Sequence, residues 1–223
     1  MHYARNIILD FDGTIFQLFV NHNLNSLISK ICEFIKEYDI NFNEKNDAFD
    51  IFERINVSDI SEELKSILLR QIQIWFIEEE IKALNSGILI DGFEDFIQCA
   101  FKNNKKVAVA SNNSKECIEK FLEKFEFGKN KKYYIPIVGR DGQHPGKMKP
   151  DPYMLEAICK NNSWSECDTV YVGDHPRDYE CAMRFGCDFI GMTPTEIKKE
   201  RLIKYAPSIT TVDNFFELIK IIE

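Results

Sequence analysis

The sequence predicts an α/β protein: a Rossmann-like parallel sheet core with helices on both faces, and a small all-helical cap domain. Three observations support this prediction. Short apolar segments alternate with segments of helical periodicity over most of the chain, which is typical of βαβ units. The apolar segments are rich in β-branched residues, as expected of strands that are buried on both faces. Residues 16–87 break the alternation and contain only helical patterns.

Six apolar segments are predicted to be strands, at residues 6–9, 105–110, 133–138, 169–172, 188–192 and 208–212. The third of these is the weakest, because Pro136 has no amide hydrogen to donate to a neighbouring strand. Helices are expected over about residues 93–103, 114–126, 151–162, 176–185 and 213–222.

The helical stretch is predicted to be a cap domain inserted after the first strand. We expect residues 1–15 and 88–223 to form the core domain and residues 16–87 to form the cap. Three cap helices are indicated by apolar residues at helical spacing, over about residues 23–38, 48–55 and 61–84. In the cap, Trp75 and Phe76 are interpreted as packing residues and not as platforms for a substrate.

Composition and charge exclude several classes of function. The chain has 223 residues and a formal net charge of −8, which disfavours non-specific binding to nucleic acid. No apolar run is long enough to cross a membrane, and the N-terminus has no apolar signal region, so we expect a cytoplasmic protein without a membrane partner. The seven cysteines form no Cys-x-x-Cys pair, which argues against zinc and favours reduced thiols.

Two carboxylates follow the first predicted strand, at Asp10 and Asp12. In an extended chain, residues two positions apart point to the same side. Two close carboxylates repel each other unless a cation or a shared proton intervenes, and Mg²⁺ prefers oxygen ligands of this kind. The simpler alternative is a strand that ends in an ordinary Asp-Gly turn.

Polar side chains also follow the second predicted strand. Ligands bind at the carboxyl ends of strands in open parallel sheets. Ser111 and Asn112 occupy such an end and offer a hydroxyl and an amide to a phosphate oxygen. Alternatively, Asn113 or Ser114 only caps the next helix.

Two further acids and a lysine lie near other predicted strand ends. Asp174 and Asp178 follow the strand at 169–172, although Asp174 is also a candidate helix cap. Lys149 precedes Pro150 and Pro152, which hold the segment extended up to a helix start. A solvated surface lysine is the alternative at this position.

These four groups together resemble the motifs of the haloacid dehalogenase-like hydrolase superfamily. They are similar to the branch that inserts a helical cap after the first strand and includes phosphatases such as phosphoglycolate phosphatase. The matching residues are Asp10-Phe11-Asp12-Gly13-Thr14, Ser111, Lys149-Pro150-Asp151-Pro152 and Gly173-Asp174-His175-Pro176-Arg177-Asp178. The resemblance covers the core, whereas the cap resembles the family only in location, helical character and length.

The resemblance implies a catalytic role for each motif. Asp10 would attack phosphorus and form an aspartyl-phosphate. Asp12 would act as the general acid for the leaving group and then as the general base for water. Ser111 and Lys149 would hold the phosphoryl group.

The same resemblance implies a Mg²⁺ cofactor and further phosphate contacts. Asp10, Asp174 and the backbone carbonyl of Asp12 would bind the metal. Asp178 would lie among the metal ligands or just outside them, or would orient Lys149. Thr14 and Asn112 complete the predicted phosphate-binding set, with Thr14 forming hydrogen bonds in the turn after the first strand.

The function implied is a Mg²⁺-dependent phosphomonoester hydrolase that acts on a small phosphorylated metabolite. Family members that attack carbon lack an acid two residues after the nucleophile, so Asp12 favours chemistry at phosphorus. Two alternatives remain open: a sugar-phosphate phosphomutase that uses the same residues, and a non-catalytic binding or regulatory protein of the same fold.

The leaving group is not specified by the sequence. Many capped relatives carry a Gly-Thr-Leu-x-Asp run, where this chain has Gly13-Thr14-Ile15-Phe16-Gln17. Arg140, His144 and Lys147 are candidates for contact with an anionic leaving group, with solvated loop residues as the equal alternative.

Overall fold

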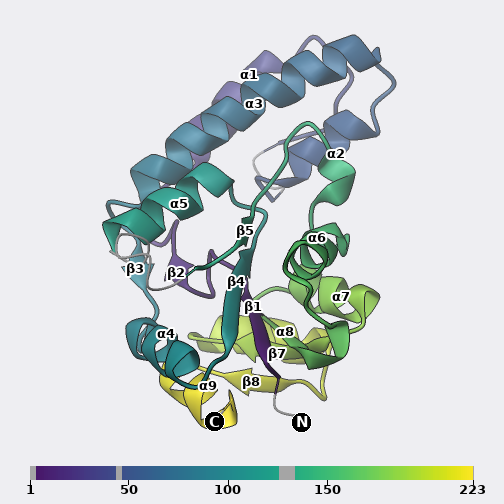
Figure 1. Cartoon of the computed structure of the whole chain (residues 1–223). Coiled ribbons are helices and arrows are strands. Elements are labelled where there is room, and N and C mark those ends of the chain that lie inside the picture. The colour runs from purple at the N-terminus through teal and green to yellow at the C-terminus, as the bar shows by residue number, and fades with distance from the viewer. Residues whose placement is uncertain (1–3, 44–46, 126–133, 223) are drawn as a thin grey trace.

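A parallel six-stranded sheet forms the centre of the molecule in a computed structural model that describes residues 4–43, 47–125 and 134–222 (Figure 1). The strand order is β5-β4-β1-β6-β7-β8. The strands are β1 (Asn6–Leu9), β4 (Lys106–Ala110), β5 (Ile137–Val138), β6 (Thr169–Gly173), β7 (Asp188–Met192) and β8 (Thr210–Val212). The N-terminal strand β1 therefore lies between β4 and β6, and the carboxyl ends of all three meet at one edge.

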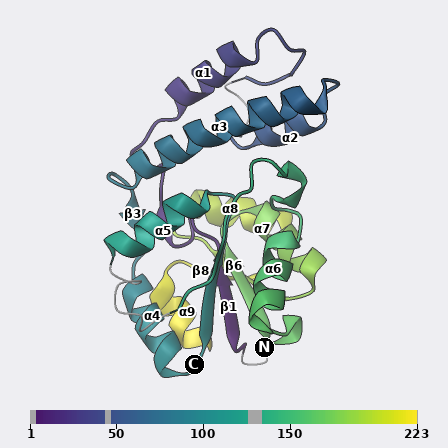
Figure 2. The same cartoon turned by 45° about the horizontal axis from the view of Figure 1, so that its top comes forward.

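Helices cover both faces of this sheet, so the predicted fold class is confirmed (Figure 2). Ile7 and Leu9 face one layer, and Ile8 between them faces the other, as the two-residue period of a strand requires. The first layer contains α4 (Phe93–Lys102), α5 (Lys115–Lys124) and α9 (Phe215–Ile222). The second contains α6 (Tyr153–Asn162), α7 (Pro176–Phe185) and α8 (Glu196–Tyr205).

The cap consists of three helices that lie beyond the carboxyl edge of the sheet (Figure 1). They are α1 (Asn25–Phe34), α2 (Asp50–Asn56) and α3 (Glu62–Ala83). Ser61 begins α3, where its hydroxyl accepts a hydrogen bond of 3.3 Å from the backbone amide of Leu64. The cap helices pack around an apolar cluster that also includes Met148 of the core. The domain boundaries themselves stay a prediction.

Aromatic residues fill this cap cluster as the sequence analysis expected. Phe76 is fully buried, and its ring lies 5.2 Å from that of Phe49 and 5.4 Å from that of Phe52. Trp75 packs edge-on against Phe34 at a centroid distance of 5.0 Å. Both predicted packing residues therefore stabilise the cap from within.

Three features differ from the sequence prediction. The chain segments that join cap and core form two short antiparallel strands, β2 (Phe16–Gln17) and β3 (Ile88–Leu89). Helix α8 was not predicted, and β5 is shorter than the expected strand, whose first residue, Tyr133, lies outside the described residues. Two 3₁₀ turns, η1 (Pro145–Lys147) and η2 (Glu166–Asp168), complete the elements of the residues that the structure describes. Within the described ranges, no helix has the length and apolarity that a bilayer crossing requires.

Candidate active site

A cavity of about 280 Å³ lies at the carboxyl edge of the sheet, between core and cap. Every residue predicted to be catalytic, metal-binding or phosphate-binding lines it, with the exception of Thr14. The lining residues are Asp10, Asp12, Asp47, Phe49, Ser111, Asn112, Asn113, Lys149, Asp174, His175, Arg177, Asp178, Lys198 and Arg201. The fold thus brings together motifs that are separated by more than a hundred residues in the chain.

The turn after β1 directs the first two acids into the cavity. The backbone amide of Asp10 still donates to the carbonyl of Val172 on β6, at 2.8 Å. Gly13 follows with a φ of 85°, a left-handed conformation that glycine adopts without strain. Asp12 is partly buried, and its Oδ1 accepts a 2.8 Å hydrogen bond from the amide of Leu18. The turn therefore fixes both carboxylates relative to the end of the strand.

Thr14 lies in the same turn but is fully buried and does not line the cavity. Its backbone amide donates to the carbonyl of Phe11 at 3.3 Å. Its Oγ1 has no hydrogen-bond partner among the residues that the structure describes. A phosphate contact by Thr14 stays a prediction that this geometry does not favour.

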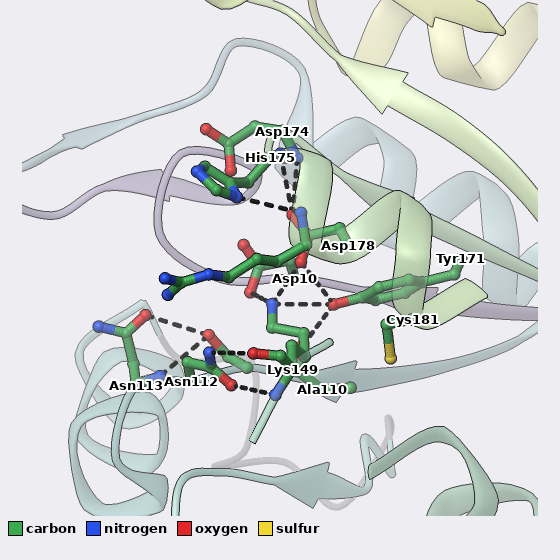
Figure 3. Close-up of polar contacts among 12 residues, drawn as sticks. Asp10, Ala110, Asn112, Asn113, Lys149, Tyr171, Asp174, His175, Asp178 and Cys181 are labelled. Carbon is green, nitrogen blue, oxygen red and sulfur yellow. Dashed lines mark hydrogen bonds and ion pairs between the residues drawn. The ribbon is translucent and has the colours of Figure 1, made fainter. Parts of the chain in front are cut away.

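Lys149 lies at the centre of the polar network (Figure 3). Its Nζ is 2.5 Å from Asp10 Oδ1, 2.6 Å from Asp178 Oδ1 and 2.9 Å from the hydroxyl of Tyr171. These contacts use all three donors of the ammonium group. Although burial alone lowers the pKa of Lys149, the carboxylates of Asp10 and Asp178 raise it above its ordinary value. Lys149 therefore remains a cation beside the candidate nucleophile.

Asn112 holds the backbone at Lys149. Its Oδ1 accepts a 2.8 Å hydrogen bond from the Lys149 amide, and its Nδ2 donates to the Lys149 carbonyl at 3.2 Å (Figure 3). The amide side chain thus joins the end of β4 to the loop that carries the lysine.

Asp178 uses both of its carboxylate oxygens within the protein. Oδ1 contacts Lys149 and Tyr171, and Oδ2 accepts from the backbone amides of Asp174 and His175 at 3.1 and 3.0 Å. Its side chain is 1% exposed. This arrangement favours the predicted role in which Asp178 orients Lys149, and it shows that Asp178 also holds the Asp174 loop. Metal binding by Asp178 stays a prediction.

A buried group of carboxylates fits a hard divalent cation. One carboxylate oxygen from each of Asp10, Asp174 and Asp178 lies within 4.8 Å of the others. Lys198 already forms an ion pair with this group: its Nζ is 2.7 Å from Asp174 Oδ2 and 3.3 Å from the carbonyl oxygen of Gly13. A donor set made only of oxygen atoms suits Mg²⁺. Asp10 and Asp174 are the residues that fit such an ion best.

Burial also alters the acidity of the first two carboxyl groups. It raises the pKa of Asp10 to about 7, even though the Lys149 ammonium opposes the change. It raises the pKa of Asp12 to about 7 as well, against the hydrogen bond from the Leu18 amide. A carboxyl group with a pKa near neutrality can both give and accept a proton at neutral pH.

The loop residues considered for contact with a leaving group lie elsewhere. Arg140 is buried in an ion pair with Glu80, at 2.8 Å. His144 Nδ1 lies 2.6 Å from Asp141 Oδ2. Lys147 Nζ lies over the ring of Tyr153, at 4.6 Å from its centroid. None of the three candidates lines the cavity.

The cations Arg177, Lys198 and Arg201 lie at the cavity wall instead, together with His175, whose pKa is lowered by burial and whose Nδ1 accepts from the Arg177 amide at 3.1 Å. His175 and Arg177 belong to the last sequence motif, but no role was predicted for them. Lys198 and Arg201 belong to α8, the helix that was not predicted. A helix predicted directly after β7 would have indicated both residues. In a parallel sheet, the helix that follows a strand begins near the carboxyl end of that strand, where ligands bind.

The fold, with these motifs gathered at the carboxyl edge of the sheet, indicates a class of hydrolases. Residues 7–192 match the family model of haloacid dehalogenase-like hydrolases, and the chain belongs to this family. The family resemblance inferred from the four motifs is therefore confirmed, and so is the assignment as a hydrolase. No curated protein matches the sequence.

Solved structures of similar fold cover essentially the whole chain. A predicted phosphoglycolate phosphatase from Haemophilus somnus has 19% identity, a TM-score of 0.64 and full coverage of both chains. A predicted phosphatase from Clostridium acetobutylicum has 18% identity, a TM-score of 0.65 and 98% coverage of both chains. A haloacid dehalogenase-like family protein from Streptococcus pneumoniae has 12% identity and a TM-score of 0.66, again with full coverage. At these identities the similarity establishes the shared fold.

Proposed function

We propose that the protein is a Mg²⁺-dependent phosphomonoester hydrolase that acts on a small phosphorylated metabolite through an aspartyl-phosphate on Asp10. The observation that carries this proposal is the contact of 2.5 Å between Asp10 and Lys149 in a cavity that Asp12 also lines. A nucleophilic carboxylate, a cation for the phosphoryl group and a second acid of near-neutral pKa are thus in one place.

The metal would be held by Asp10 and Asp174, together with the backbone carbonyl of Asp12. When bound, it would supply positive charge that offsets repulsion between the anionic nucleophile and the anionic phosphate. Binding would also favour the ionised form of Asp10.

The protein's own residues would then carry out two displacements at phosphorus. Lys149 would exchange one of its contacts within the protein for an oxygen of the phosphoryl group, and Ser111 would bind another. A carboxylate oxygen of Asp10 would attack phosphorus while the bond to the leaving oxygen breaks. Asp12 gives its proton to that leaving oxygen. In the second step Asp12 takes a proton from water, the water oxygen attacks phosphorus, and inorganic phosphate leaves Asp10.

The size of the cavity and the cations at its wall agree with a small phosphorylated substrate. Its volume of about 280 Å³ suits a metabolite, and Arg177, Lys198 and Arg201 place cations beside the five Asp carboxylates of the wall. Two of the compared structures are of predicted phosphatases, which agrees with the proposal. A cytoplasmic location and the absence of nucleic-acid and membrane partners, expected from the sequence, belong to the same proposal.

Phosphate release from a panel of phosphomonoesters tests this function, in Mg²⁺ and in EDTA, with Asp10→Asn as the control. We expect release that requires both Mg²⁺ and Asp10. Isomerisation of a sugar phosphate without net release of phosphate would instead identify a mutase. The absence of release from every substrate, together with no binding of divalent metal, would contradict the proposal.

A further inference from the structure

A buried ion pair joins the cap to the core beside the cavity. Glu80 of α3 and Arg140 of the loop after β5 have side chains that are 0% exposed, with Arg140 Nη1 2.8 Å from Glu80 Oε1. The guanidinium carbon also lies 5.0–5.2 Å from the ring centroids of Phe49, Phe52 and Phe76, all in the cap. The arginine of the core is therefore seated within the aromatic cluster of the cap.

Both members of the pair bind the loop that follows β4. Arg140 Nη1 donates to the carbonyl of Asn112 at 2.7 Å, and the backbone amide of Arg140 donates to the carbonyl of Asn113 at 2.8 Å. Glu80 accepts from Asn113 Nδ2 at 3.3 Å and from the backbone amide of Ser114 at 3.1 Å. The Ser114 hydroxyl also donates to Glu80. One carboxylate and one guanidinium thus hold three consecutive residues.

The loop so held carries the predicted phosphoryl-binding groups. Ser111 Oγ donates to Asn113 Oδ1 at 3.0 Å and accepts from the Asn113 amide at 3.2 Å. The side chain of Asn112 forms hydrogen bonds with the backbone amide and carbonyl of Lys149. The position of Ser111 relative to Lys149 therefore depends on a segment fixed from the cap side by Glu80.

A charged pair is a costly way to join two packed surfaces, because both ions lose their hydration. Apolar side chains would hold cap and core together as well, but they would not orient hydrogen-bond donors and acceptors. We propose that Glu80 and Arg140 are positioning residues that set the Ser111–Asn112 segment against Lys149 for phosphoryl transfer. The catalytic part of this inference rests on the proposed function.

A double variant and a matched control test the proposal. Glu80→Leu combined with Arg140→Met removes both charges, so that neither ion is left buried without a partner. Glu79→Gln is the control, because Glu79 is the neighbouring residue of α3 and forms ion pairs with His22 and Lys82 instead. It makes no contact with the Ser111 loop among the interactions that the structure describes.

The first measurement does not require activity. Hydrogen exchange of the backbone amides at residues 111–114 reports whether the loop is held. We expect exchange about tenfold faster in the double variant than in the wild type, because the hydrogen bond from the Ser114 amide to the Glu80 carboxylate is lost. Glu79→Gln should leave this exchange unchanged. Unchanged protection in the folded double variant would overturn the proposal.

The second measurement separates positioning from general stability. At a temperature well below unfolding, the double variant should lower kcat by about tenfold or more relative to the wild type. In a chain that already carries Ser111→Ala, the same double change should lower kcat by less than about twofold. Additive effects of the two changes would overturn the proposal, since Glu80 would then not act through Ser111. If the wild type hydrolyses no phosphomonoester while loop exchange changes as expected, the proposed function fails and the positioning of the loop stands.

Discussion

Replacement of Asp178 by asparagine distinguishes an acid that orients Lys149 from one that binds the metal. Asp178 Oδ1 lies 2.6 Å from Lys149 Nζ, and Oδ2 accepts two backbone amides. An asparagine side chain has the same shape but only one acceptor oxygen. If that oxygen stays on the backbone amides, the side-chain NH₂ group faces the Lys149 ammonium, and two donors oppose each other.

The expected cost follows from these contacts. A hydrogen bond to a charged group contributes about 1.5–3 kcal/mol, and stripping a buried charge of its partner costs about 3–5 kcal/mol. Lys149 keeps Asp10 as a partner, so we expect a loss of about 2–3 kcal/mol in the free energy of unfolding. For a chain of this length, Tm should fall by about 4–12 °C. We expect kcat to fall by about 10- to 100-fold, as for other residues that orient the groups around a metal site.

Urea and thermal unfolding give the stability of Asp178→Asn, and calorimetric titration gives its affinity for Mg²⁺. Asp174→Asn is the control, because Asp174 is the better candidate for direct metal binding. It should weaken Mg²⁺ binding more than Asp178→Asn does. Equal loss of Mg²⁺ affinity in the two variants, or normal kcat with a Tm within about 2 °C of wild type, would refute the role assigned to Asp178.

Two further predictions concern the metal site. Lys198→Ala should raise the affinity for Mg²⁺, because its ammonium lies 2.7 Å from Asp174 Oδ2 and 3.3 Å from the Gly13 carbonyl and competes for these oxygens; unchanged or weaker binding in a titration would contradict this. The raised pKa values of Asp10 and Asp12, both about 7, mean that their protonated forms stabilise the metal-free fold fully below about pH 4 and that this contribution is lost as pH rises through about 7. Since Mg²⁺ binds the ionised carboxylates, it should raise Tm more at about pH 8 than at about pH 5, and an equal rise in melting curves at both would be inconsistent with these pKa values.

Local signals explain why some elements were predicted with the correct bounds. Helix α7 begins at Pro176, whose fixed φ suits a first helical turn, and ends before Gly186, which adopts a φ of 89°. Helix α8 (Glu196–Tyr205) has a local start signal, because the Thr195 hydroxyl caps it by accepting from the Lys198 amide, but it lacks an apolar stripe: Leu202 is its one buried residue, and most of the others are polar or charged. Two-residue strands such as β2 and β3 are too short for any periodicity and form only when the two linkers meet.

The site residues likewise divide into those with a local signal in the sequence and those whose role depends on the folded structure. Asp10, Asp12 and Asp178 were found because their spacing from strand ends is visible in the chain. Glu80 was not, because its role depends on Arg140, sixty positions later, and on a cap that folds over the sheet. Tyr171 was part of an apolar strand in the sequence, and only the packed structure shows its hydroxyl against Lys149 and the Ala110 carbonyl.

Detection of a phosphorylated Asp10 during turnover tests the central claim most directly. The protein would be mixed with Mg²⁺ and a phosphomonoester that it hydrolyses, and the reaction would be quenched in acid. Reduction with borohydride then converts an aspartyl-phosphate into homoserine. We predict that mass spectrometry finds homoserine at position 10 in the wild type and not in Asp10→Asn. Hydrolysis of the substrate at the wild-type rate by Asp10→Asn, or a reduced residue at any other position, would contradict the account.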